Sequence, residues 1–138
     1  MIATGARYNV IAKVFLFLAH LSHNFTAGQS IADLLRYCSC GSSCDAMQAQ
    51  LEWRHLAPTA PDTMACYPFV DSDPFMLDDK SPHLYVAGNQ PAFEQRDVGG
   101  VKVIAVPEFS STGEVVIFDL ATGIARSMRF CAEKSTAL

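Results

Sequence analysis

The stretch from His55 to Phe75, HLAPTAPDTMACYPFVDSDPF, constrains the fold more than any other part of the chain. It holds four prolines in 21 positions. Each proline fixes φ and removes a backbone donor, so no long helix or central strand can run through this stretch. It is nevertheless too apolar for a solvated linker. We therefore expect an irregular connector, anchored by the aromatic side chains of Tyr67, Phe69 and Phe75, and we call residues 55–75 the connector below.

Two short helices are expected before the connector. The first spans residues 30–37, with Ser30 as its N-cap and Asp33 at the capping-box position. The second spans residues 43–54 and has Ser43 as its cap. Its apolar positions recur at i, i+3 and i+7, as on one face of a helix: Cys44, Met47 and Leu51.

Strands are expected after the connector. The β-branched and apolar runs are LYVAG (84–88), VKVIAVP (101–107), EVVIFDL (114–120) and GIARSMRF (123–130). A Gly-Asn turn should end the first run, and Gly99-Gly100 should form a hairpin turn. Helices followed by strands predict an α/β (α+β) fold that ends in an antiparallel meander, rather than repeated βαβ units. Strands this apolar predict a sheet covered on both faces.

Composition limits the classes of function. Half of the 138 residues are hydrophobic and 17% are charged, which is typical of one folded domain. The net charge of −4 argues against binding a nucleic-acid backbone by electrostatics alone. The cysteines are odd in number and unevenly spaced, which favours free thiols in a reducing compartment: Cys38, Cys40, Cys44, Cys66 and Cys131.

The apolar run from Val10 to Leu21 resembles a signal peptide in outline. Lys13 interrupts it, no small-residue cleavage site follows, and it is shorter than the roughly 20 residues of a transmembrane helix. We interpret it as a core element. The triplet Asn24-Phe25-Thr26 matches a glycosylation sequon, so a secreted glycoprotein remains the alternative.

Two sets of residues could hold a metal. Cys38, Cys40 and Cys44, with His55 or Cys66 as a fourth ligand, could bind zinc, although structural zinc sites usually consist of two closely spaced pairs. The second set could form a dinuclear site for phosphoester hydrolysis. It consists of Asp62, Asp71, Asp73, Asp78 and Asp79 with His55 and His83. Asp beside proline commonly begins a turn, so a solvated loop is favoured for the second set.

Several longer segments of the sequence resemble a known protein family. RHLAPTAPDTMACYPF (54–69), DPF (73–75) and PHLYVAGNQPAFE (82–94) closely resemble the family of small, or B, subunits of eukaryotic DNA polymerase delta. GQSIADLLRY (28–37) and VKVIAVPEFSSTGEVVIFDL (101–120) extend the likeness. The signature residues are Arg54, His55, Pro58, Thr59, Pro61, Asp62, Cys66, Tyr67, Pro68, Asp73, Pro74 and Phe75.

The resemblance implies a division of the chain. Residues 26–130 would be the C-terminal part of a calcineurin-like phosphoesterase domain, a two-sheet sandwich with flanking helices. Residues 1–25 match nothing in the family, and residues 131–138 form a tail. The cysteine cluster departs from the family pattern, which weakens the zinc hypothesis.

The resemblance also bears on catalysis. Active calcineurin-like phosphoesterases end their metal site with a G-H-x-H motif after a strand, and the corresponding residues here are Gly88, Asn89, Gln90 and Pro91. Carboxamides are poor metal ligands and proline has no side-chain donor, so we expect no catalytic residues, metal or other cofactor.

The expected function is therefore that of a non-catalytic accessory subunit, or part of one, in DNA replication and repair. Its expected partners are the C-terminal domain of the polymerase delta catalytic subunit and further polymerase subunits. DNA contact would be indirect, the location nuclear, and no membrane is involved. A metal-dependent phosphoesterase that uses the Asp/His set is the alternative.

Overall fold

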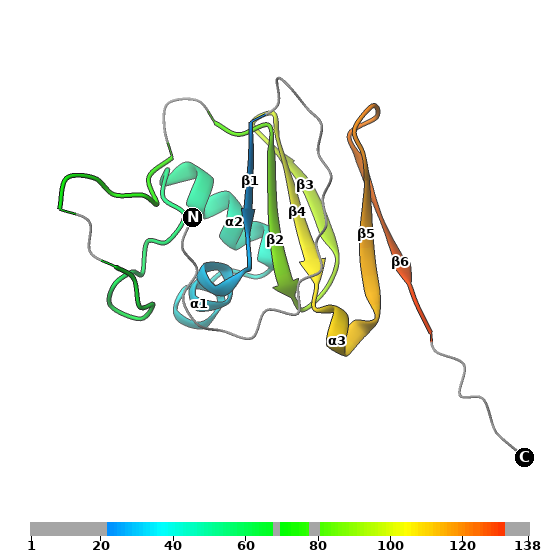
Figure 1. Ribbon diagram of the computed structural model, residues 1–138, viewed down its shortest axis with the longest axis horizontal. Helices are drawn as coiled ribbons and strands as arrows, with labels where there is room; N and C mark the ends of the chain where they lie inside the picture. The colour runs from blue at the N-terminus through cyan, green and yellow to red at the C-terminus, as the bar shows by residue number, and fades with distance from the viewer. Residues whose placement is uncertain (1–21, 68–69, 78–80, 132–138) are drawn as a thin grey trace, which may run out of the picture.

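The computed structural model describes residues 22–67, 70–77 and 81–131, and its centre is a four-stranded sheet (Figure 1). The strands are β1 (His23–Thr26), β2 (Leu84–Gln90), β3 (Glu94–Val98) and β4 (Val101–Pro107), in the spatial order β1-β2-β4-β3. β1, β2 and β4 run parallel, whereas β3 pairs antiparallel with β4. Gly99 and Gly100 join β3 to β4 with positive φ angles of 58° and 86°, so the predicted hairpin turn is confirmed.

Helices α1 (Gln29–Tyr37) and α2 (Ser43–Glu52) cover one face of this sheet (Figure 1). Their apolar faces pack on alternate residues of β2 and β4, because successive strand residues point to opposite faces. Fully buried side chains dominate this core: Ile31, Leu34, Met47, Tyr85 and Val103. The predicted apolar face of the second helix is confirmed for Cys44 and Met47, which are buried, while Leu51 packs at the edge of the core.

Both predicted helix caps are wrong by one or two residues. The N-cap of α1 is Gly28 in the left-handed region, and Ser30 lies buried within the first turn. The N-cap of α2 is Ser42, whose Oγ accepts a hydrogen bond from the Asp45 N–H at 3.2 Å. In each case the chain enters the helix earlier than the serine that the pattern suggested.

A second sheet packs on the other face. After the short α3 (Phe109–Thr112), β5 (Glu114–Asp119) and β6 (Ile124–Arg129) form an antiparallel hairpin beside the main sheet (Figure 1). Val116, Phe118 and Ala125 contact Leu84 and Ile104 of the main sheet. The predicted mixed α/β class is confirmed, and so is the prediction that the strands are covered on both faces.

The strand predictions need three corrections. The antiparallel ending is two hairpins in two sheets rather than one meander, because α3 lies between β4 and β5. β2 continues through Gly88 and Asn89 to Gln90 with an irregular register, so no turn ends it at Gly-Asn. β1 and β3 were not predicted as strands, since both are short and β3 is largely polar.

Other predictions fall partly outside the described residues. The Val10–Leu21 run, Pro68, Phe69, Asp78 and Asp79 lie outside them, as do residues 132–138 of the tail. Within the described residues, no helix combines the length and apolar character needed to cross a bilayer.

Candidate functional site

The carboxyl ends of β1 and β2 form the edge at which Gly88, Asn89, Gln90 and Pro91 lie. Parallel strands bring these ends together, and ligand sites of α/β sheets commonly form there. Asn89 adopts a positive φ of 54°, and its Nδ2 donates to the carbonyl oxygen of Ala27 at 3.0 Å. Gln90 is buried, and its Nε2 donates to the carbonyl oxygen of Gly88 at 2.7 Å. Pro91 is exposed beyond the strand end.

Gly28 completes this edge from the β1 side. Its φ is 91°, which L side chains rarely adopt, and a Cβ there would collide with the carbonyl oxygen of Gly88 and Nε2 of Gln90. The backbone after β1 therefore lies directly against the end of β2. The amide of Asn89 fastens the end of β2 to the backbone that follows β1, whereas the amide of Gln90 bonds within β2 itself. Neither side chain supplies an acid, a base or a nucleophile.

His55 and Asp73 hold the two ends of the connector together. The N–H of Ala57 donates to Nδ1 of His55 at 3.1 Å, and Nε2 lies 2.9 Å from Oδ2 of Asp73. Since Nδ1 accepts, the ring proton belongs on Nε2, which donates to the carboxylate. The N–H of Phe75, followed by His55, lowers the pKa of Asp73. Both side chains thus have structural partners within the connector.

Asp33 of α1 fixes the middle of the connector. Oδ2 of this buried carboxylate accepts hydrogen bonds from the hydroxyls of Thr59 and Thr63. These bonds, first that of Thr59 and then that of Thr63, lower the pKa of Asp33. The sequence pattern predicted a capping role for Asp33, but its carboxylate is used for a contact between two distant segments.

Gln50 of α2 links the connector to the main sheet. Its Nε2 donates to the carbonyl oxygen of Leu56 at 2.9 Å, and its Oε1 accepts from the hydroxyl of Tyr85 at 2.5 Å. Both Gln50 and Tyr85 are fully buried, and burial raises the pKa of the Tyr85 hydroxyl, which keeps it a neutral donor. Sequence reasoning did not identify Gln50.

The remaining signature residues lie along the surface of the connector. Pro58, Pro61, Asp62, Tyr67 and Pro74 are exposed, and Cys66 is half-buried. Arg54 precedes the connector with a positive φ of 53°, and its carbonyl oxygen accepts from the N–H of Leu77 at 2.8 Å. Tyr67 is 78% exposed, so the prediction that its ring anchors the connector by apolar contact is wrong. Phe75 is half-buried, and its carbonyl oxygen accepts from the N–H of Leu56 at 2.8 Å.

The cysteines do not form a ligand cluster with the predicted partners. Cys44 is buried in the core, and burial, followed by the Glu94 carboxylate, raises the pKa of its thiol to about 12. Zinc binds the thiolate, so Cys44 is a poor ligand. Cys38 is exposed and Cys40 half-buried. Over residues 22–67, 70–77 and 81–131, no three His, Cys, Asp or Glu side chains lie close enough to hold a metal ion.

The members of the Asp/His set likewise do not come together at one site among the described residues. Only His55 and Asp73 are brought together among its described members. Nδ1 of His83 lies 3.2 Å from both the backbone N and the Oγ of Ser22, at the start of β1. Asp62 and Asp71 are exposed, and the prediction of a solvated loop for them agrees with that exposure.

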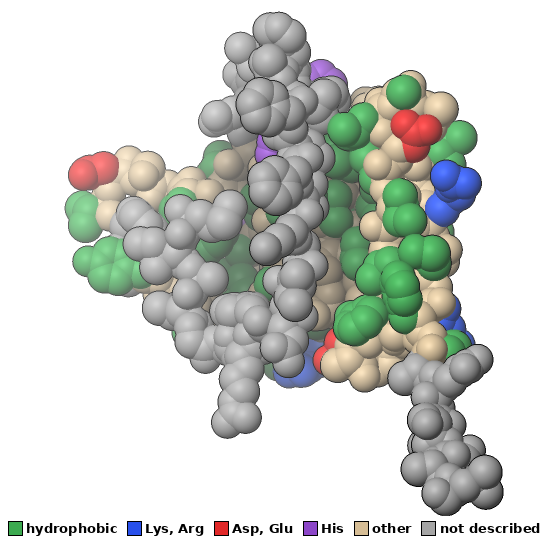
Figure 2. All heavy atoms as spheres, turned by 45° about the vertical axis from the view of Figure 1, so that its right-hand side comes forward, with side chains coloured by type: hydrophobic (Ala, Val, Ile, Leu, Met, Phe, Trp, Pro, Cys, Tyr) green, Lys and Arg blue, Asp and Glu red, His purple; other side chains and the backbone are tan. Residues whose placement is uncertain are grey.

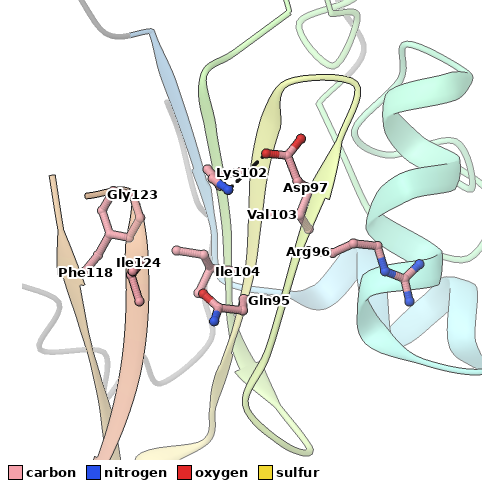
Figure 3. Close-up of a pocket in the computed structure, with 9 residues that line it drawn as sticks. All are labelled: Gln95, Arg96, Asp97, Lys102, Val103, Ile104, Phe118, Gly123 and Ile124. Carbon is pink, nitrogen blue, oxygen red and sulfur yellow. Dashed lines mark ion pairs between the residues drawn. The ribbon is translucent and has the colours of Figure 1, made fainter. Parts of the chain in front are cut away.

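A shallow pocket of about 200 Å³ lies between the two hairpins (Figure 3). Ile104, Phe118 and Ile124 supply apolar lining, and Lys102 pairs with Asp97 at 3.0 Å. Arg96 points away from the pocket toward α2, where it pairs with Asp45 at 2.7 Å. The lining contains no histidine, cysteine or serine, and its lysine and aspartate are paired with one another.

Comparison with known proteins agrees with the resemblance stated above. Residues 21–95 match the model of the family of DNA polymerase alpha/epsilon B subunits. A Drosophila melanogaster protein named DNA polymerase delta subunit 2 is 42% identical over 113 residues, which are 78% of this chain and 26% of the relative.

Two further relatives carry the name DNA polymerase delta small subunit. The one from Saccharomyces cerevisiae is 52% identical over 82 residues, 56% of this chain and 17% of the relative. The one from Arabidopsis thaliana is 44% identical over 100 residues, 69% of this chain and 22% of the relative. The chain thus spans about a quarter or less of the length of these relatives, and the predicted likeness to polymerase delta small subunits is confirmed.

Proposed function

Because the chain belongs to the family of DNA polymerase alpha/epsilon B subunits, we propose that it serves as a non-catalytic accessory part of a polymerase delta assembly in DNA replication and repair. Its role is to hold other subunits in place through protein contacts. The proposed direct partner is the C-terminal domain of the catalytic subunit, the proposed location is the nucleus, and contact with DNA is indirect, in keeping with the net charge of −4.

The observation that carries the non-catalytic role is the edge formed by β1 and β2. The amide of Asn89 fastens the end of β2 to Ala27 after β1, and the amide of Gln90 bonds to Gly88 within β2. Gly28 brings the backbone of one strand end against the other. The amide nitrogens of both side chains are used in these bonds, and carboxamides are poor metal ligands. Both points support the proposal that this position is a degenerate metal motif.

The connector supports the same proposal. His55 and Asp73, the two members of the Asp/His set that meet, hydrogen-bond to one another and to backbone N–H groups of the connector. In the proposed function, the signature residues shape a surface and carry no reaction. We propose the same domain limits as above, with residues 26–130 as the phosphoesterase-like part and 1–25 and 131–138 as flanking segments.

Two experiments test the proposal. The first is a pull-down with the C-terminal domain of the polymerase delta catalytic subunit, using this chain and a version extended upstream with the sequence of a relative. Capture by either version supports the accessory role, and capture by neither argues against it. The second measures manganese-stimulated hydrolysis of bis(p-nitrophenyl) phosphate. Turnover above buffer that His55→Ala abolishes would favour the phosphoesterase alternative.

A further inference from the structure

The β5–β6 hairpin has two faces of different character. In an antiparallel pair, directly opposite residues share a face. The inner face contains the pairs Val116–Ser127 and Phe118–Ala125, through which the hairpin packs on the main sheet. The Glu114–Arg129 row lies on the same side as these two. The three rows that alternate with them form what we call the outer face: Val115–Met128, Ile117–Arg126 and Asp119–Ile124.

The outer face exposes large apolar side chains. Ile117 is 48% exposed and Met128 44%. Ile124, in the end row, is 52% exposed and also borders the pocket between the two hairpins. They come from adjacent rows of one small sheet, so they are neighbours rather than scattered surface residues. Hydrophobic side chains gather over this hairpin in the space-filling view (Figure 2). Contiguous exposed apolar surface of this kind is typical of a contact with another protein.

Arg126 occupies the middle row of the outer face. Within the described residues no carboxylate lies within ion-pair distance of its guanidinium. Its charged neighbour on this face is Asp119, whose carboxylate bonds chiefly with the N–H of Ala121 in the turn. A cation at the centre of an apolar face selects a partner that places a carboxylate there and excludes partners with a cation.

We propose that the outer face of the β5–β6 hairpin docks an apolar segment of another subunit of the polymerase assembly, with a carboxylate of that segment opposite Arg126. This inference rests on the proposed function and assigns a surface to it. Methionine, apolar residues and a central arginine are the side chains enriched in protein interfaces. A second copy of this chain fits less well, because face-to-face docking would bring two Arg126 side chains together at the centre.

Site-specific crosslinking of the assembled complex tests the occupant. The full chain is co-expressed with the polymerase delta subunits, with a photo-crosslinking amino acid at Ile117 or, as the control, at Ser127 on the inner-face rows. We expect position 117 to crosslink to another subunit and position 127 to do so at least tenfold less. Crosslinks from 117 only within this chain, only to a second copy, or to nothing in an intact complex would overturn the proposal.

Charge substitution tests the role of Arg126 in the same complex. We expect Arg126→Glu to weaken binding by about tenfold or more, Arg126→Lys to retain most of it, and Ser127→Glu to leave it unchanged. Raising the salt concentration should weaken the wild-type complex more than the Arg126→Ala complex. Equal binding by Arg126→Glu and wild type would overturn the predicted carboxylate. Failure of the wild-type chain to assemble at all would overturn the proposed function along with this surface, so the two failures are distinct.

Discussion

The connector and the β5–β6 hairpin are attached to the rest of the molecule in opposite ways. The connector has almost no regular structure over its described residues, 55–67 and 70–75. Hydrogen bonds nevertheless tie it to Asp33 of α1 and to Gln50 of α2. The hairpin is regular, but it meets the main sheet chiefly through apolar side chains. The N–H of Ala125 also donates to Oε1 of Gln95 at 3.1 Å.

The comparison shows that a segment without regular secondary structure can be held in place more firmly than a regular hairpin. Hydrogen bonds are directional and costly to leave unmade in a buried site, so they specify where the connector lies. Apolar contact is non-directional and tolerates small shifts of one surface over another. We therefore expect substitutions near the connector to cost more than comparable substitutions in the hairpin.

The largest difference is expected at two glycines with positive φ. Gly28→Ala should lower the free energy of unfolding by about 4 kcal/mol, because left-handed strain adds to overpacking against the buried amide of Gln90 and the end of β2. Gly113 precedes the hairpin, and Gly113→Ala should lower the free energy of unfolding by about 2 kcal/mol. Its Cβ would lie 2.7 Å from the carbonyl oxygen of Phe130, an exposed residue that can move aside. Urea unfolding of the full chain, followed by Trp53 fluorescence, measures both. Equal costs would mean that the buried strand ends beside Gly28 yield as easily as the exposed end of the hairpin.

The next effect is expected at Gln50. Gln50→Leu should cost about 3 kcal/mol, because it leaves the Tyr85 hydroxyl and the Leu56 carbonyl oxygen buried without their partner. The same unfolding experiment measures it. The partly buried Val116→Ala in the hairpin should cost about 1 kcal/mol and serves as the reference.

A double substitution separates the bond from general packing damage. Adding Tyr85→Phe to Gln50→Leu removes the hydroxyl that the first change leaves unpaired, so the pair should cost about 1 kcal/mol less than the sum of the single changes. Strictly additive costs would mean that the two side chains do not depend on one another.

The regular elements could be predicted from the sequence, and the contacts between them could not. β4 was predicted to the residue, and both helices within two residues at their starts, because apolar periodicity reports which face is buried. β1 and β3 were missed because four or five residues carry too little periodicity.

The roles of Gln50 and Asp33 depend on residues far along the chain, Tyr85 for the first and Thr59 for the second. A signal for Gln50 was nevertheless present, since it lies three residues after Met47 on the buried face of α2. A polar residue on the buried face of a helix predicts that a hydrogen-bond partner is buried with it, but does not show which residue that partner is. The irregular course of the connector was predictable from its prolines, but its anchors are polar and not the predicted Tyr67.

The smallest effect is expected at Asp33 and depends on pH. The folded pKa of this carboxyl is lowered from an unfolded value of about 4, so its contribution to stability is present above that value and is lost as pH falls through the folded pKa. Asp33→Asn should cost about 1 kcal/mol at neutral pH, because an amide oxygen accepts more weakly than a carboxylate. The gap between wild type and variant should narrow in acid. Urea unfolding at pH 7, 5 and 3 measures it.

Asp119 provides the matched carboxyl in the hairpin. The N–H of Ala121, followed by Thr122, lowers its pKa as well, and the charge of Arg126 adds a smaller contribution. The two main partners lie within the same turn. Asparagine suits that turn geometry, so Asp119→Asn should leave the unfolding free energy nearly unchanged at neutral pH. If Asp119→Asn proved as costly as Asp33→Asn, local turn bonds would matter as much as bonds between distant segments. The carboxylate that holds the connector would then stabilise the fold no more than the carboxylate in the hairpin turn.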